Sequence, residues 1–184
     1  MELSNITETQ IDAALPLVEA GLRKYCWLQG NVKRLNVEKN DEFQRRFNDF
    51  YKVRRDENWR AIYYKLMETA KAEGITFPVA LRSLTTQTGR IEASFASKLV
   101  ATLNPDCPVI DKFILGNFDL RLPYHYSSDR ENKTISIYNQ LCSKITNVMN
   151  SNHGEMICSK FQKRYPWADI TDTKKIDLVF WKIR

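Results

Sequence analysis

The chain has 184 residues, 43% of them apolar and 27% charged, and a formal net charge of +6 at pH 7. This length predicts one domain that buries about 70% of the surface its unfolded form exposes. The composition excludes collagen-like, low-complexity and strongly disordered chains. No apolar run approaches the ~18 residues of a membrane helix, and the polar start lacks the pattern of a signal peptide, so we expect a cytoplasmic protein without a membrane partner. The positive charge permits an anionic partner.

Four cysteines are spread singly along the chain, with no C-x-x-C pair and only two histidines beside them. Zinc sites and redox motifs need ligands at closer spacing. An iron–sulfur cluster is also excluded, because the cysteines do not cluster near the C-terminus. The sequence therefore predicts no metal and no cofactor, and it predicts four buried, reduced thiols: Cys26, Cys107, Cys142 and Cys158.

The first predicted helix begins at Thr7-Glu8-Thr9-Gln10, which has the pattern of a capping box. We expect this helix to run to about Leu28. Pro16 lies inside it and predicts a kink or a split, because proline removes a backbone hydrogen bond and clashes with the preceding turn. Gly30-Asn31 then predicts a turn.

Apolar residues recur at helical spacing along most of the remaining chain. Gly74 predicts a helix end, Pro78 a first helical turn, and residues 122–129 a loop. The last apolar segment is too dense to show a period, and we favour helix over strand there. No segment alternates at period two for long enough to build a sheet, so residues 1–184 are expected to form one compact all-α domain. Further helices are expected at 43–51, 59–70, 76 onward, 94–103, 111–118, 131–150, 157–165 and 173–182.

One part of the predicted loop has the residue types of a nucleophile triad, since His125 is followed by Ser127, Ser128 and Asp129. Residues so close together in one loop rarely reach the geometry that orients a base against a nucleophile. We therefore interpret this stretch as a loop. The motifs of nucleotide hydrolysis and of zinc proteolysis are absent from the chain.

The most informative stretch runs from Thr88 to Phe113. A helix, a turn at Gly89, a second helix rich in small residues, and Pro108-Val109-Ile110-Asp111 at the next helix start follow one another. This order resembles the helix-hairpin-helix DNA glycosylases, the superfamily of endonuclease III and 8-oxoguanine glycosylase. The resemblance implies a multi-helix fold with a hairpin-like segment at about 81–118, and duplex DNA as the partner.

The resemblance also implies roles for particular residues. Gly89-Arg90-Ile91 opens the second hairpin helix, where free amides and the helix dipole favour a DNA phosphate. Lys98 and Lys112 are further expected DNA contacts. Asp111 matches the aspartate that lies near the flipped nucleotide in the family, where a carboxylate supports base loss by stabilising cationic charge on the sugar.

The chain departs from the family in one important respect. Bifunctional members carry a nucleophilic lysine just after the hairpin glycine, whereas the residues from Gly89 to Ser94 include no lysine. Lys98 comes thirteen residues before Asp111, too late in the second helix to match. We therefore expect base excision without a lysine nucleophile, by a monofunctional glycosylase-like hydrolase that borohydride does not trap on DNA.

Simpler interpretations stand beside these roles. Asp111 is also explained as a helix N-cap, worth about 1 kcal/mol, and the two roles are compatible. Lys98 is also explained as a solvated charge on a helix face. The basic stretch from Lys52 to Arg55 is interpreted as a solvated helix face as well, because Asp56 and Glu57 follow it.

Two functions of different classes therefore remain open. The first is a DNA-associated protein with a glycosylase-like helical fold, which binds duplex DNA through the hairpin and uses Asp111 for catalysis. The second is a non-catalytic all-α protein-interaction domain, whose partner the sequence does not name. Positive charge gathered around Gly89 to Lys98 would favour DNA, and scattered charge would favour the interaction domain.

Overall fold

Helices form all of the regular secondary structure in the computed structural model, which describes residues 6–183. The all-α prediction is therefore confirmed for these residues. The nine described helices, in chain order, are α1 (Glu8–Val32), α2 (Asp41–Tyr51), α3 (Glu57–Glu73), α4 (Phe77–Thr88), α5 (Ala93–Leu103), α6 (Lys112–Asn117), α7 (Arg130–Met149), α8 (Asn152–Arg164) and α9 (Asp172–Phe180).

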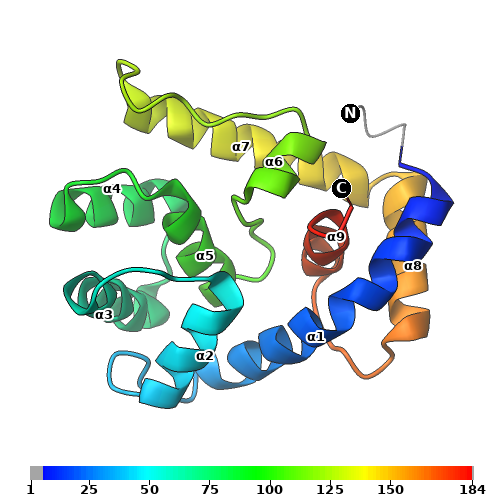
Figure 1. The fold of residues 1–184 in the computed structure, drawn as a ribbon, viewed down its shortest axis with the longest axis horizontal. Helices are drawn as coiled ribbons and strands as arrows, with labels where there is room; N and C mark the ends of the chain where they lie inside the picture. Colours follow the sequence, from blue (N-terminus) through cyan, green and yellow to red (C-terminus); the bar gives the residue numbers. More distant parts are fainter. Residues whose placement is uncertain (1–5, 184) are drawn as a thin grey trace.

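The long helix α1 connects two groups of helices. It packs against α2 and α5 along one part of its length and against α8 and α9 along another. Figure 1 shows α2 to α5 on one side of the molecule, α8 and α9 on the other, and α7 across the top. Within the first group α5 packs against α3 and α4, and within the second α9 packs against α6, α7 and α8. Besides α1, the contact of α4 with α7 joins the two groups.

Several helix boundaries follow from local sequence, as expected. Thr7 forms the predicted capping box with Gln10, because the Thr7 hydroxyl accepts from the Gln10 amide and the Gln10 side chain accepts from the Thr7 amide. Gly74 ends α3 with a φ of 75°, a backbone conformation that glycine adopts without strain. The segment of residues 121–129 contains no helix, in agreement with the predicted loop.

Helix α1 is longer and more continuous than the sequence predicts. Pro16 lies inside it without dividing it, and Gly30-Asn31, expected to form a turn, lies in its last turns. The predicted split at Pro16 and the predicted turn at Gly30-Asn31 are therefore both wrong, and for the same reason. Leu22, Leu28 and Val32 are almost fully buried along one face of the helix, and the packing of that face outweighs the local cost of proline and glycine.

Helix α8 begins at Asn152, earlier than the expected start near Ile157. The stretch from Ser151 to Gly154, expected to be a loop, is the N-cap and the first turn of this helix, and the Ser151 hydroxyl accepts from the Gly154 amide. A Cβ atom added at Gly154 would lie only 2.1 Å from the Val148 carbonyl oxygen. Glycine is thus required here by the close approach of α8 to the end of α7.

Helix α9 confirms the choice of helix over strand for the last apolar segment, and it is buried on nearly all sides. Its buried residues include polar ones, which the sequence analysis did not single out. None of the described helices is long and apolar enough to cross a membrane. The four cysteines carry free thiols and are half-buried, which is less burial than expected.

Candidate functional site: a cavity between α2, α5 and α9

A cavity of about 190 Å³ opens where the end of α2, the middle of α5, the start of α6 and α9 come together. A closed apolar cavity of about 150 Å³ holds a benzene molecule, so this space suits a compact ring. Its wall combines aromatic and aliphatic side chains with five charged ones. The lining residues are Phe50, Tyr51, Lys52, Lys98, Val109, Asp111, Ile114, Lys174, Asp177, Leu178 and Trp181.

Two serines of α5 fix the chain segment that carries Asp111. The Ser97 hydroxyl accepts from the Ile110 amide at 2.8 Å, and the Ser94 hydroxyl donates to the Ile110 carbonyl at 2.9 Å. Both backbone groups of Ile110 are therefore held by α5, and the next residue, Asp111, has a defined place beside it.

Asp111 caps a helix and also lines the cavity. It is the N-cap of α6, where its Oδ1 atom accepts from the Phe113 amide at 2.8 Å. The N-cap interpretation is thus confirmed. The half-buried side chain also lines the cavity, and it lines a neighbouring surface depression together with Lys112 and Arg121. Capping leaves the second carboxylate oxygen able to act on a molecule in the cavity.

Lys98 differs most from its expected environment. Its side chain is half-buried in the cavity wall, its ammonium donates to the Tyr51 carbonyl at 3.1 Å, and it lies 4.9 Å from the centre of the Phe95 ring. Burial lowers the pKa of the Lys98 amine, and the nearby Asp111 carboxylate acts in the opposite direction. The interpretation of Lys98 as a solvated surface charge is therefore wrong.

Lys98 lies near Asp111 in space although thirteen residues separate the two in the chain. Ser94 and Lys98 are four residues apart, so they share one face of α5. Because Ser94 binds the backbone next to Asp111, the same face brings Lys98 to the cavity that Asp111 lines. The chain between Lys98 and Asp111 folds back along α5, a path that residue counting does not reveal.

Helix α9 contributes a buried ion pair that the sequence analysis missed. The Lys174 ammonium lies 2.5 Å from Asp177 Oδ2, and both side chains are about 5% exposed. Lys174 also lies 4.7 Å from the centre of the Tyr25 ring. A signal was present in the sequence, since the two charges stand three residues apart inside the apolar run that closes the chain.

Gly89, Arg90 and Ile91 form the turn between α4 and α5. The prediction that they open the second helix is wrong, because α5 begins at Ala93. Gly89 ends α4 with a φ of 70°, Arg90 is exposed, and Ile91 packs against the core. Glu92, the N-cap of α5, is buried and receives two hydrogen bonds from the Arg55 guanidinium at 2.8 and 2.9 Å. The interpretation of Arg55 as part of a solvated helix face is therefore wrong, and a paired carboxylate lies beside the first amides of α5.

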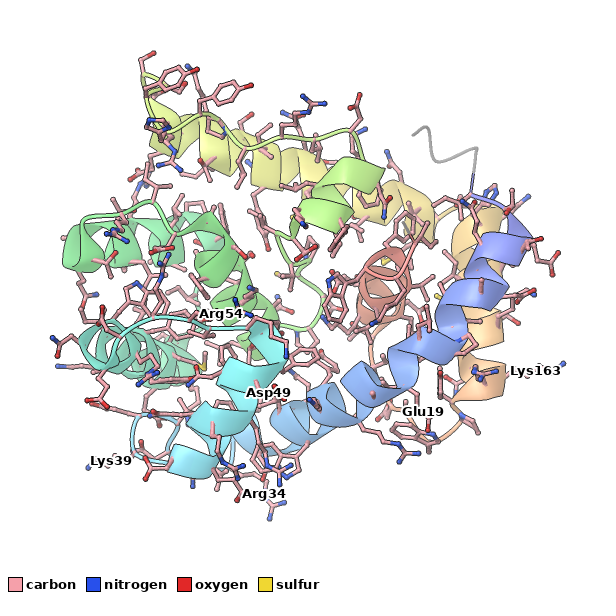
Figure 2. All side chains as sticks on the ribbon, in the orientation of Figure 1. Glu19, Arg34, Lys39, Asp49, Arg54 and Lys163 are labelled. Carbon is pink, nitrogen blue, oxygen red and sulfur yellow. The ribbon has the colours of Figure 1, made fainter. Side chains whose placement is uncertain are left out.

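Cations without a carboxylate partner flank the hairpin and the cavity. Arg54 and Arg90 line one cleft, and Lys112 and Arg121 line the depression beside Asp111. No carboxylate of the described residues lies within 4.0 Å of any of these four. Figure 2 places Arg54 beside the centre of the molecule, far from Lys163 and Lys39 at its edges.

Further unpaired cations lie on other parts of the surface. Among the described residues they include a group between the end of α1 and the middle of α2, formed by Lys33, Arg34, Lys39 and Arg45. Positive charge is thus present around the hairpin but is not confined to it. Charge placement alone does not separate the two functions that the sequence leaves open. The residues that line the cavity are the stronger criterion.

Comparisons with protein-family models, curated proteins and solved structures find no match to this chain. Within residues 6–183, no three histidine, cysteine or acidic side chains are grouped so that they could hold a metal ion. The functional argument therefore depends on the residues of the cavity and the surface around it.

Proposed function

We propose that this protein binds duplex DNA on the face that includes the α4–α5 turn, and that the cavity receives a base extruded from the duplex. The observation that carries the proposal is the joint presence of Lys98 and Asp111 in the wall of one cavity of suitable size. An enzyme that acts on a base in a duplex must take that base out of the stack and hold it in such a pocket.

Lys98 would act as the nucleophile. Its lowered pKa increases the fraction of neutral amine, which is the form that attacks carbon. In the proposed step the Lys98 nitrogen bonds to C1′ of the sugar while the glycosidic bond breaks. The base leaves with the bonding electron pair and takes up a proton, and opening of the sugar ring gives a Schiff base on Lys98.

Asp111 would stabilise the positive charge that develops on the sugar during this step. A carboxylate held in a partly buried site acts strongly on nearby charge, because little water screens it. Its cap bond to Phe113 and the two serine contacts to Ile110 hold it before the substrate arrives. Such preorganisation avoids the cost of turning dipoles during the reaction.

The exposed cations would bind the DNA backbone. Arg54 and Arg90 lie along one cleft, and Lys112 and Arg121 lie beside Asp111, so phosphate contacts would flank the cavity on two sides. Such contacts position a protein on DNA without reading its sequence.

Borohydride trapping tests the proposal. The wild-type chain, incubated with duplexes that contain an abasic site or a damaged base, should form a covalent adduct on reduction, because borohydride reduces the Schiff base to a stable amine. Lys98→Gln should form none. Lys163→Gln, which changes an exposed lysine far from the cavity, should behave as wild type.

Three results would contradict this function in different ways. An adduct that persists in Lys98→Gln would assign the chemistry to another amine. Release of a base without any adduct would restore the lysine-free mechanism that the sequence predicts. Absence of duplex binding even at low salt would remove the DNA function and favour the protein-interaction domain.

A further inference from the structure

Lys174 and Asp177 form a buried ion pair, and both residues line the cavity. A buried ion pair is weak evidence for stability, because well-packed apolar residues often replace such pairs without loss. Buried charges in a cavity are instead typical of binding and catalytic sites. The Lys98 and Asp111 chemistry proposed above makes no use of this pair.

The pair has unused hydrogen-bonding capacity. Asp177 Oδ2 accepts from Lys174, but Asp177 Oδ1 is buried and has no hydrogen-bond partner among the described residues. A buried acceptor without a partner costs about 1–3 kcal/mol, so it calls for an explanation. The Lys174 ammonium has three N–H donors, and its one hydrogen bond within the described residues is the bond to Asp177. One acceptor and one donor therefore stand side by side in the cavity wall.

The rest of the wall suits a flat ring. Phe50, Tyr51 and Trp181 contribute aromatic surface, and Val109, Ile114 and Leu178 contribute aliphatic surface. Aromatic side chains stack on the faces of bases, whereas the edge of a base forms hydrogen bonds. A base between these side chains would therefore present its edge to Lys174 and Asp177.

We propose that Lys174 and Asp177 select a neutral lactam-type base, in which a ring N–H stands next to a carbonyl group. The N–H donates to Asp177 Oδ1, and the carbonyl oxygen accepts from the Lys174 ammonium. This inference rests on the proposed function only in taking the occupant to be a base, and it adds which class of base the cavity accepts.

Charge complementarity favours the lactam edge over the alternatives. A lactam N–H is positive and its carbonyl oxygen is negative, so its dipole opposes that of the ion pair and both hydrogen bonds are charge-assisted. The amino edge of adenine pairs an amino group with a ring nitrogen, which is a weaker acceptor than a carbonyl oxygen.

Binding of free nucleosides to the full chain tests this selection by calorimetry. Inosine has one N–H on its base, next to a carbonyl, and 1-methylinosine lacks that N–H. We expect inosine to bind at least about tenfold more tightly than 1-methylinosine, because the methylated base loses the N–H that donates to a charged group. Adenosine should bind more weakly than inosine, because its ring nitrogen is the weaker acceptor.

A double variant assigns the selection to the ion pair. Lys174→Met with Asp177→Leu removes both charges at once and should keep the fold, since neither charge is left unpaired. It should bind inosine and 1-methylinosine within about twofold of each other, a ratio that corresponds to less than one hydrogen bond. The matched control is Lys175→Met with Asp172→Leu, which removes an ion pair of the same helix that does not line the cavity and should keep the tenfold preference.

The possible outcomes separate this inference from the proposed function. Equal binding of inosine and 1-methylinosine by the wild type, or no nucleoside binding at all, would overturn the lactam selection. A tenfold preference for inosine that persists in the variant with Lys174→Met and Asp177→Leu would also overturn it. Nucleosides carry no phosphate and need no reaction at Lys98, so loss of DNA binding or of borohydride trapping leaves this measurement unaffected.

Discussion

The hydroxyl of Ser97 accepts a hydrogen bond from the buried amide of Ile110 at 2.8 Å, which joins the middle of α5 to the residue before Asp111. Ser97 also donates to the Ser94 carbonyl at 2.9 Å, so its hydroxyl is satisfied in both directions. The site residue Asp111 thus takes its position from a helix that precedes it in the chain.

Ser97→Ala should destabilise the protein by about 1–3 kcal/mol, because it leaves the Ile110 amide buried without an acceptor. The free energy of unfolding, measured by denaturant titration, checks this value. Ser143→Ala serves as the control, since the exposed Ser143 hydroxyl only donates back to a carbonyl of its own helix. The control should change stability by less than about 0.5 kcal/mol. Equal effects of the two substitutions would contradict the structural role of Ser97.

Asp111→Asn and Asp111→Ala should separate the cap from the chemistry. Asparagine still accepts from the Phe113 amide, so Asp111→Asn should keep most of the stability, while Asp111→Ala should lose about 1 kcal/mol. Stabilisation of a cationic sugar needs the charge itself, so both variants should lose most of the adduct formation. Thermal melts and borohydride trapping of the same preparations measure the two effects. Full trapping by Asp111→Asn would restrict Asp111 to its role as a cap.

Trapping through Lys98 should depend on pH in a defined direction. Burial lowers the pKa of Lys98 from the usual 10.5, so the neutral amine should accumulate at a lower pH than for an ordinary lysine. The rate of adduct formation should therefore rise with pH and level off below 10.5. A rate that still rises steeply through pH 10.5 would indicate a solvated amine and would contradict the burial of Lys98.

The same lowered pKa predicts a pH-dependent contribution to stability. The unfolded chain binds the Lys98 proton more tightly than the folded chain, so folding becomes more favourable as pH rises between the folded and unfolded pKa values. Below the folded pKa the penalty of burying the charged amine is complete. Lys98→Met removes this contribution, and its stability relative to wild type should decrease as pH approaches 10.5. Denaturant titrations at several pH values measure the difference, and a constant difference would contradict the assignment.

Arg54→Gln with Arg90→Gln should weaken duplex binding and reduce its dependence on salt. Each phosphate contact contributes about 0.9 to the slope of log K against log salt, so the slope should fall by about 2. Lys39→Gln with Lys163→Gln removes the same charge at the edges of the molecule and should leave the slope nearly unchanged. An equal decrease in both double variants would place the DNA elsewhere or indicate only general attraction.

Gly154→Ala and Gly30→Ala should change stability in opposite directions. A Cβ atom at Gly154 would meet the Val148 carbonyl oxygen at 2.1 Å, and this backbone contact cannot relax without moving α7 against α8. The expected loss is at least about 1–3 kcal/mol. At Gly30, inside α1, a Cβ atom meets nothing within 4 Å, so alanine should stabilise the helix by about 0.5–1 kcal/mol. Thermal melts of both variants check the two signs.

The sequence by itself determined the helical class and most of the helix boundaries. Caps such as Thr7 and Asp111, the glycine at Gly74 and the proline after Thr76 act through atoms within a few residues of one another. Apolar spacing likewise depends only on the geometry of one helix. These features could be read without knowing what any helix packs against.

Tertiary packing determined the conformation of the chain at positions where local rules conflict. Pro16 and Gly30 are tolerated inside α1 because the buried face of that helix packs against both groups of helices. The cavity depends still more on contacts between distant residues. Lys98 meets Asp111 only because the intervening chain folds back along α5, and Lys174 is buried only because Asp177 neutralises it within the packed interior. Burial, and contacts between residues that are distant in the chain, determine the environment of these charged side chains. Spacing along the chain does not encode either of them.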